Sequence, residues 1–291
     1  MFNARILAVL IGLLSFFVSG QSTCFFVSAH QDDWQLFINP NVYESIKNEA
    51  DKTVIIHTTA GEAGMGMGND AYYLAREKGS LAAVRFLSNT YTTGAGLGAE
   101  MQRNYVDLNG HQVLRYQYRN CVVYLLRLPD GNGQGTGYEL HEYKTLAKLF
   151  DGSIQNLPTI DKSTIYKDRK DLESTLNALL LKEQIGEKKE IHLADTDPSI
   201  NPGDHSDHQT SSKYFQAVAK EMGGIQLYLY TNYASAQQPK NVPEEGFLVS
   251  AAAWGVTTAH IADHRHYSTW DDVHNNWIGR QYFRTISLPK K

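Results

Sequence analysis

The sequence has few cysteines, no excess of basic residues and no segment of low complexity. Its 291 residues include two cysteines. The 27 Lys and Arg and the 31 Asp and Glu give a net charge of −4. A nucleic-acid-binding domain normally carries clustered Lys and Arg and a basic net charge, so the composition argues against a nucleic-acid partner. We expect the partner to be a small molecule or a neutral polymer.

The usual sequence signals of covalent catalysis are also absent. The sequence has no G-x-S-x-G nucleophile elbow, and neither Cys24 nor Cys121 has a neighbour suited to activate its thiol. Both cysteines stand at the start of predicted strands. An exported protein permits a disulfide between them, and two unpaired buried thiols are the alternative.

The N-terminus has the pattern of a secretory signal. Arg5 precedes an apolar run of 13 residues at positions 6–18, and Val-Ser-Gly at 18–20 forms a small-residue cleavage site. The run is shorter than the roughly 20 residues that span a bilayer. We therefore expect residues 1–20 to be cleaved and the protein to be secreted or periplasmic, without stable membrane insertion after cleavage. The alternative is an uncleaved N-terminal helix that anchors the protein.

The remaining chain, residues 21–291, shows no linker or repeat, and we expect a single domain with an aromatic and His-rich C-terminal region. Continuous apolar runs alternate with amphipathic patterns, which is typical of an α/β fold. We predict a Rossmann-like, mostly parallel sheet with helices on both faces. The predicted strands are 24–29, 53–59, 121–128, 191–195 and 225–232, and the predicted helices are 39–50, 70–88, 138–150, 170–184 and 208–224.

Ionisable side chains gather where two of the predicted strands end. AHQDD at 29–33 follows the first strand, and HSDH at 205–208 follows the strand at 191–195. In open α/β sheets the ligand site lies at the carboxyl ends of the strands. Imidazole and carboxylate together suit zinc, which in catalytic sites keeps about three protein ligands and one open position. Asp32, next to a candidate ligand, is the natural general base for a water molecule.

These stretches resemble the LmbE-like or PIG-L family of zinc-dependent N-acetylglucosaminide deacetylases. The family's AHPDDE and HPDH motifs stand here as AHQDDW at 29–34 and HSDH at 205–208. TTAGEAG at 58–64, LAREKGSLAAVRFL at 74–87 and LPDG at 128–131 also match the family pattern, in the family's order. The resemblance covers roughly residues 24–222.

The resemblance implies a role for each matching residue. His30, Asp33 and His208 would bind zinc, and Asp32 would be the general base. The other matching residues would assist: a protonated His205 would stabilise the oxyanion or protonate the leaving amine, Asp207 would orient a histidine, and Arg76 would contact substrate.

The sequence departs from the family at three motif positions, where Gln31, Trp34 and Ser206 replace Pro, Glu and Pro. None of these positions is a ligand in the family. Trp34 adds a flat apolar surface that would suit stacking on a sugar. The departures bear on substrate identity more than on chemistry.

The C-terminal stretch at 260–277 contains four histidines and two tryptophans. His264 and His266 form an H-x-H pair that could hold a second metal. We favour a loop beside the cleft in which His266 and Trp270 shape substrate binding, and an aromatic surface patch without a role is the remaining alternative.

The leading hypothesis is an exported zinc hydrolase that removes acetyl from an N-acetylated amino sugar or glycoconjugate. The partner would then be a small-molecule or oligosaccharide substrate that carries an N-acetyl group. The rival is a secreted carbohydrate-binding protein on a catalytically inactive deacetylase scaffold. Retention of Asp32 and His205 argues against the rival, because a binding protein needs neither a base nor an oxyanion partner. A metal-dependent phosphoesterase would normally need a two-metal cluster with more carboxylates.

Overall fold

The structure is a computed structural model that describes residues 21–90 and 99–291. The predicted signal peptide, residues 1–20, lies outside the described residues. Within the described ranges, every helix is too short or too polar to cross a membrane.

An eight-stranded sheet forms the centre of the molecule, with strand order β10-β9-β8-β1-β2-β5-β4-β3. Five central strands run parallel, and three strands at the two edges pair antiparallel. The predicted α/β fold with a mainly parallel sheet is therefore confirmed. The central strands are β1 (Ser22–Ser28), β2 (Lys52–Thr59), β5 (Cys121–Leu128), β8 (Lys188–Ala194) and β9 (Gln226–Thr231), and the edge strands are β3 (Gln102–Leu108), β4 (His111–Tyr118) and β10 (Tyr282–Ser287).

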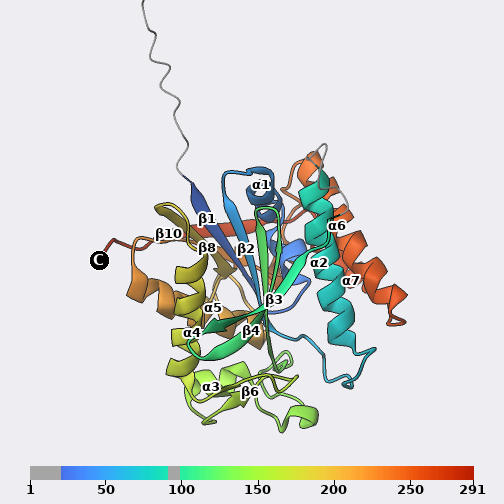
Figure 1. The fold of residues 1–291 in the computed structure, drawn as a ribbon. Helices are drawn as coiled ribbons and strands as arrows, with labels where there is room; N and C mark the ends of the chain where they lie inside the picture. The colour runs from blue at the N-terminus through green and yellow to red at the C-terminus, as the bar shows by residue number, and fades with distance from the viewer. Residues whose placement is uncertain (1–20, 91–98) are drawn as a thin grey trace, which may run out of the picture.

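Helices cover both faces of the sheet, as Figure 1 shows with α4 and α5 on one side and α2 and α6 on the other. One apolar core lies under the first group and a second core lies under the other. Strand β1 is buried along its whole length because it contributes to both cores. One face carries α3 (Leu146–Asp151), α4 (Arg169–Glu183) and α5 (Ser206–Met222), and the other carries η1 (Trp34–Ile38), α1 (Asn41–Lys47), α2 (Tyr72–Thr90) and α6 (Glu244–Asp263).

Two parts of the chain differ from the sequence prediction. The predicted helix at 138–150 is wrong: a short turn, η2 (Glu139–His141), is separated from α3 by Glu142 and Tyr143, which have positive φ angles of 54° and 55°. A right-handed helix cannot pass through two left-handed residues. The hairpin of β3 and β4 was not predicted, although Asn109-Gly110 at its turn is a strong hairpin signal.

The C-terminal region, for which no helix or strand was predicted, forms α6, the short helix α7 (Asp272–Asn275) and β10. A small two-stranded sheet, β6 (Leu157–Pro158) and β7 (Ile165–Tyr166), and a turn at η3 (Tyr233–Gln237) complete the described elements. Cys24 and Cys121 are both buried and unpaired, which favours the second of the two alternatives drawn from the sequence. Burial raises the pKa of each thiol to about 12, so neither acts as a nucleophile at neutral pH.

Candidate metal centre and active site

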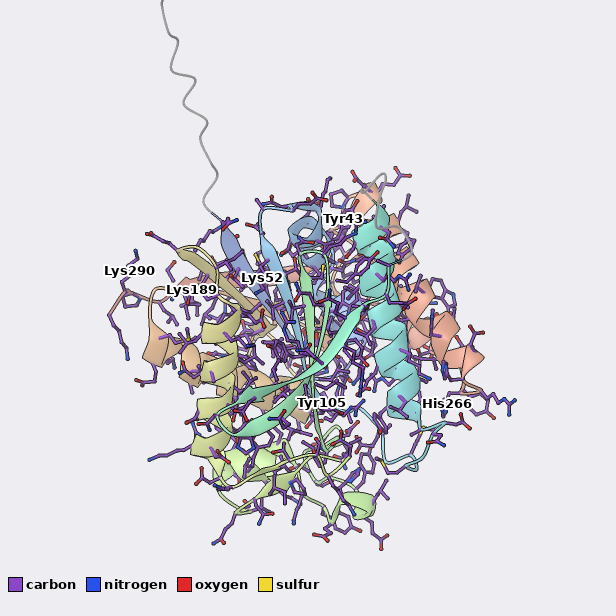
Figure 2. The ribbon with its side chains drawn as sticks, viewed as in Figure 1. Tyr43, Lys52, Tyr105, Lys189, His266 and Lys290 are labelled. Carbon is purple, nitrogen blue, oxygen red and sulfur yellow. The ribbon has the colours of Figure 1, made fainter. Side chains whose placement is uncertain are left out.

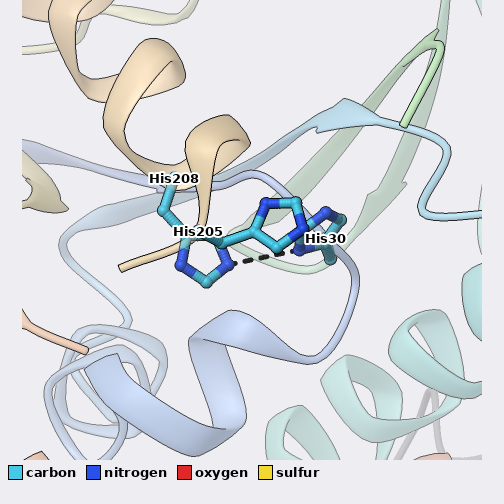
Figure 3. Close-up of side chains that lie close together, drawn as sticks. All are labelled: His30, His205 and His208. Atoms are coloured by element: carbon cyan, nitrogen blue, oxygen red, sulfur yellow. Dashed lines mark hydrogen bonds between the residues drawn. The ribbon is translucent and has the colours of Figure 1, made fainter. Parts of the chain in front are cut away.

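The candidate site lies where the sheet changes its direction of winding. Strand β1 pairs in parallel with β2 on one side and with β8 on the other. The segments that follow β1 and β8 therefore leave the sheet at the same edge and on opposite sides of a crevice, which is where open α/β sheets bind ligands. This topology brings His30 and His208 together although 178 residues separate them. Figure 3 shows their rings with that of His205.

Three ligand atoms converge at this point. His30 Nδ1 lies 3.2 Å from His208 Nε2, His208 Nε2 lies 3.1 Å from Asp33 Oδ1, and His30 Nδ1 lies 3.6 Å from Asp33 Oδ1. A tetrahedral zinc with bonds of roughly 2.0–2.1 Å would place its ligand atoms about 3.3 Å apart. All three side chains are buried, and the backbone N–H of His30 fixes the second carboxylate oxygen of Asp33 at 2.7 Å.

The donor set also fits a cation on electrostatic grounds. Burial by itself lowers the pKa of His208, but the charges of Asp33 and Asp204 outweigh it and raise this pKa to about 10. Burial likewise disfavours a charged His30, yet Asp33 and Asp207 hold its pKa well above the usual range. The surroundings thus favour positive charge between these atoms. A divalent metal supplies that charge without extra protons.

Asp204, which the sequence reasoning missed, orients one of these histidines. Its Oδ1 lies 2.7 Å from His208 Nδ1, so Nδ1 donates a proton to Asp204 and Nε2 is the nitrogen that would bind a metal. The other carboxylate oxygen accepts hydrogen bonds from Asn201, Gln209 and Asn232. The side chain is fully buried. Only its position just before HSDH in the sequence could have indicated this role.

His205 caps the first turn of α5, and its ring is held in one tautomer. Its Nδ1 accepts a hydrogen bond of 3.1 Å from the backbone N–H of Asp207, so the proton of the neutral ring lies on Nε2. Burial, together with His30 and His208, lowers the pKa of His205 to about 2. This neutral form differs from the protonated form that the family resemblance led us to expect.

Asp32 and Arg76 form a buried ion pair. Arg76, from the first turns of α2, donates from Nη2 to Asp32 Oδ1 and from Nη1 to Gly61 O at 2.7 Å. Burial disfavours a charged arginine, but the charge of Asp32 outweighs it and raises the pKa of Arg76 further. Arg76 therefore fixes the predicted base and the loop after β2, besides lining the cleft where it was expected to contact substrate.

Asp207 lies beside the second nitrogen of His30. Its Oδ2 is 3.4 Å from His30 Nε2 and accepts the backbone N–H of Gly131 at 2.8 Å. A side chain at Gly131 would collide with the Asp207 carboxylate, which explains the glycine of LPDG. Asp130 of the same stretch lies 3.9 Å from His30 Nε2, and Glu62 accepts the backbone N–H of Asp130. Asp130 lies in the LPDG stretch that matched the family pattern, but it was not among the predicted site residues.

A cleft with a volume of about 240 Å³ opens onto these residues. Its described lining combines predicted site residues with side chains that the sequence reasoning did not select. The predicted ones are His30, Asp32, Asp33, Arg76 and His205, and the others include Tyr72, Asp130, Tyr138, Tyr233, His274 and Trp277. A wider groove of about 1080 Å³ between α4 and α5 contains none of the candidate ligands.

Three predicted substrate-binding residues lie elsewhere. Trp34 is fully buried and donates from Nε1 to Ser80 Oγ at 2.9 Å, so its predicted stacking on a sugar is wrong. Its role is packing in the core between η1 and α2. His266 bonds to Asp70 O and packs against Tyr72, near the start of α2 in Figure 2. Trp270 is half-exposed beside α6. Neither residue is among the described side chains that line the cleft.

The similarity of this chain to known proteins is low. No family model matches the chain, and no curated protein matches it. Among solved structures, the chain is similar to N,N'-diacetylchitobiose deacetylase from Pyrococcus horikoshii, at 13% identity over 95% of this chain and 87% of that one, with a TM-score of 0.46. It is also similar to the zinc-inhibited form of teicoplanin deacetylase, at 12% identity over 81% and 84% of the two chains, with a TM-score of 0.41. A likeness at these values does not identify the chemistry of this chain.

Proposed function

We propose that the protein is an exported, zinc-dependent N-deacetylase that hydrolyses the acetamido group of an amino sugar or glycoconjugate. One observation supports this most directly: three candidate ligand atoms lie within 3.1–3.6 Å of one another, and two of the residues that carry them, His30 and Asp33, line a cleft together with a carboxylate held by a buried arginine. A single metal site with an adjacent, unliganded carboxylate suits hydrolysis by an activated water.

His30, Asp33 and His208 would hold the metal. A bound zinc ion would supply Lewis acidity toward an amide carbonyl and toward water, whose pKa it lowers from 15.7 to roughly 7. Arg76 keeps the Asp32 carboxylate in one position. Asp32 accepts a proton from water in the cleft and can return it to the nitrogen of the departing amine.

His205 acts in this proposal as a neutral hydrogen-bond donor. The hydrogen bond from Asp207 N leaves the proton on Nε2, and such a fixed donor stabilises negative charge that develops on the amide oxygen. Because the α5 N-terminus orients the ring before substrate arrives, little reorganisation is required during the reaction. Asp207 supports the arrangement from its position against His30.

The matched test compares acetate release by the wild type and the Asp32→Asn variant on a panel of N-acetylated sugars and simple acetamides. Asparagine keeps the size of the side chain and an oxygen that can face Arg76, but it cannot take up the proton. We expect zinc content equal to wild type and a kcat lower by roughly 10²- to 10⁴-fold. Activity near wild type in Asp32→Asn would contradict the assigned base.

The same panel separates an enzyme from a binding protein. Sugar binding without acetate release by the zinc-loaded wild type would favour the carbohydrate-binding alternative. Export is tested separately, by N-terminal sequencing of protein recovered from outside the cytoplasm of a bacterial host. We expect Gln21 as the first residue.

A further inference from the structure

Aromatic side chains from three distant segments line the cleft beside the candidate metal centre. Phe37 comes from η1, Tyr233 from η3, and His274 and Trp277 from α7 and the turn that follows it. We call these four residues the aromatic wall. The proposed chemistry uses none of them.

The aromatic wall is packed in a fixed arrangement. The rings of Tyr233 and Trp277 are stacked, with centroids 5.0 Å apart and an interplanar angle of 16°. Trp277 Nε1 donates to Tyr233 O at 3.1 Å, and the ring of Phe37 meets Trp277 edge-on at 5.3 Å. A platform whose rings are already ordered loses little conformational entropy when a ligand packs against it.

The segment that carries Trp277 is itself anchored. Asp271 caps α7 by accepting the backbone N–H of His274 at 2.9 Å, and it also bonds His274 Nδ1 at 2.8 Å. Trp254 of α6 donates from its indole nitrogen to Asn275 at 3.0 Å. Hydrogen bonds therefore hold this C-terminal segment in place at the cleft.

The chemistry of the cleft is divided between this wall and polar groups. The aromatic wall carries no carboxylate, lysine or arginine, whereas Arg76, Asp130, Tyr72 and Tyr138 add charged and hydrogen-bonding groups to the same lining. A hexopyranose ring has an apolar C–H face and hydroxyl groups around its edge, so it matches both. The volume of about 240 Å³ is below the roughly 300–1,000 Å³ of pockets for drug-sized ligands, which suits one sugar ring.

We infer that Trp277 and Tyr233 determine substrate specificity by packing against the pyranose ring that bears the acetamido group. This inference rests on the proposed deacetylase function and deepens it. It selects acetylated sugars over acetamides attached to an open chain. Sugar recognition is thereby assigned to Trp277 and Tyr233 and not to the predicted residues Trp34, His266 and Trp270.

The test compares N-acetylglucosamine with N-acetylethanolamine, an acetamide without a ring. Trp277→Ala removes the ring, and Trp277→Leu keeps apolar bulk against Phe37 if the alanine variant does not fold. We expect KM for N-acetylglucosamine to rise roughly two- to tenfold in both variants, because an aromatic contact contributes about that factor. We expect kcat, zinc content and both constants for N-acetylethanolamine to stay within about twofold of wild type.

Tyr267→Ala is the matched control, because Tyr267 carries an aromatic ring in the same region and is 97% exposed. It should leave KM for both substrates unchanged. Equal changes for the two substrates in the Trp277 variants, or no change for N-acetylglucosamine, would overturn the inference.

A binding measurement separates failure of the inference from failure of the proposed function. In saturation-transfer NMR with N-acetylglucosamine and the zinc-loaded Asp32→Asn protein, we expect transfer to the ring C–H protons of the sugar. We expect this transfer to weaken in Asp32→Asn/Trp277→Leu. Trp277-dependent ring contacts, together with no acetate release by the zinc-loaded wild type, would retain the inference and refute deacetylation. Acetate release by the wild type, with ring contacts that do not depend on Trp277, would support deacetylation and refute the inference.

Discussion

His208 shows how much the candidate site depends on single hydrogen bonds. Its two ring nitrogens lie between carboxylates, with Asp204 on Nδ1 at 2.7 Å and Asp33 on Nε2 at 3.1 Å. The contact with Asp204 decides which nitrogen carries the proton and therefore which one can bind a metal. The HSDH pattern predicted His208, but its partner is fixed by how the loop before α5 folds.

Asp204→Asn should weaken zinc binding by about 10- to 100-fold, since an amide orients the imidazole less strongly than a carboxylate. Titration of the metal-free protein against a competing chromophoric chelator measures this. Asp197→Asn is the control, because Asp197 lies in the same loop and its side chain is 38% exposed. Equal zinc affinity in wild type and Asp204→Asn would show that Asp204 does not orient the ligand.

At the scale of elements, α2, which carries Arg76, packs closely against α6. Gly79 on α2 permits this approach: a Cβ atom there would lie 2.7 Å from the backbone oxygen of Thr257 on α6. Thr257 Oγ1 also accepts a hydrogen bond from Gln35 Nε2 of η1 at 2.8 Å. A shift of α6 at this point would disturb that hydrogen bond.

Gly79→Ala should therefore lower the thermal midpoint, although alanine favours helix by about 1 kcal/mol over glycine. Overpacking costs roughly 1–3 kcal/mol and outweighs that gain. Gly255→Ala on α6 is the matched control, since its nearest neighbour would be the Trp270 ring at 3.6 Å, an ordinary contact. It should keep or slightly raise the midpoint. A stabilised Gly79→Ala would show that the two helices have room to separate.

Helix α4 is tied to the sheet by a buried carboxylate at its last residue. Glu183 accepts hydrogen bonds from Arg115 of β4 and Tyr124 of β5, and it pairs with Lys52 of β2. Burial by itself raises the pKa of Glu183, but these partners outweigh it and lower the pKa from 4.5 to about 2. The folded state thus holds the ionised form.

Because the folded pKa is depressed, this contribution to stability is present above pH 4.5 and is lost as the pH falls toward 2. Glu183→Gln should cost on the order of 3 kcal/mol at pH 7 by leaving the partly buried cations Lys52 and Arg115 unpaired. In urea unfolding, the difference in the free energy of unfolding between the variant and the wild type should decrease as the pH is lowered from 4.5 to 3. Glu221→Gln, which affects a surface pair with Lys291, is the control and should show no difference at either pH. If the difference in unfolding free energy between Glu183→Gln and the wild type did not depend on pH, Glu183 would be excluded as the titrating group.

For the whole molecule, the sheet order is what assembles the candidate site. The predicted ligands stand near residue 30 and residue 208, and only the parallel pairing of β1 with β8 brings their strand ends together. We also propose that residues 21–291 form a single domain. A metal bound between the two segments would then stabilise the entire chain.

Zinc should raise the thermal midpoint of the wild type, and a chelator should reverse the rise, because a ligand that binds only the folded state stabilises it. His208→Ala should remove most of this shift. His260→Ala, from α6 and outside the candidate ligands, should retain it. A midpoint that is insensitive to zinc in the wild type would argue against a metal at this site.

The sequence by itself determined the fold class and the chemistry of the strand ends. Buried runs such as Cys121–Leu128 encode a strand locally, and histidines and aspartates at fixed spacing mark a candidate ligand set locally. Only the tertiary structure decided which side chains surround that set. Trp34 lies in the core while Trp277 lies in the cleft, because burial and contact depend on chain packing across long sequence separations, which local pattern does not specify.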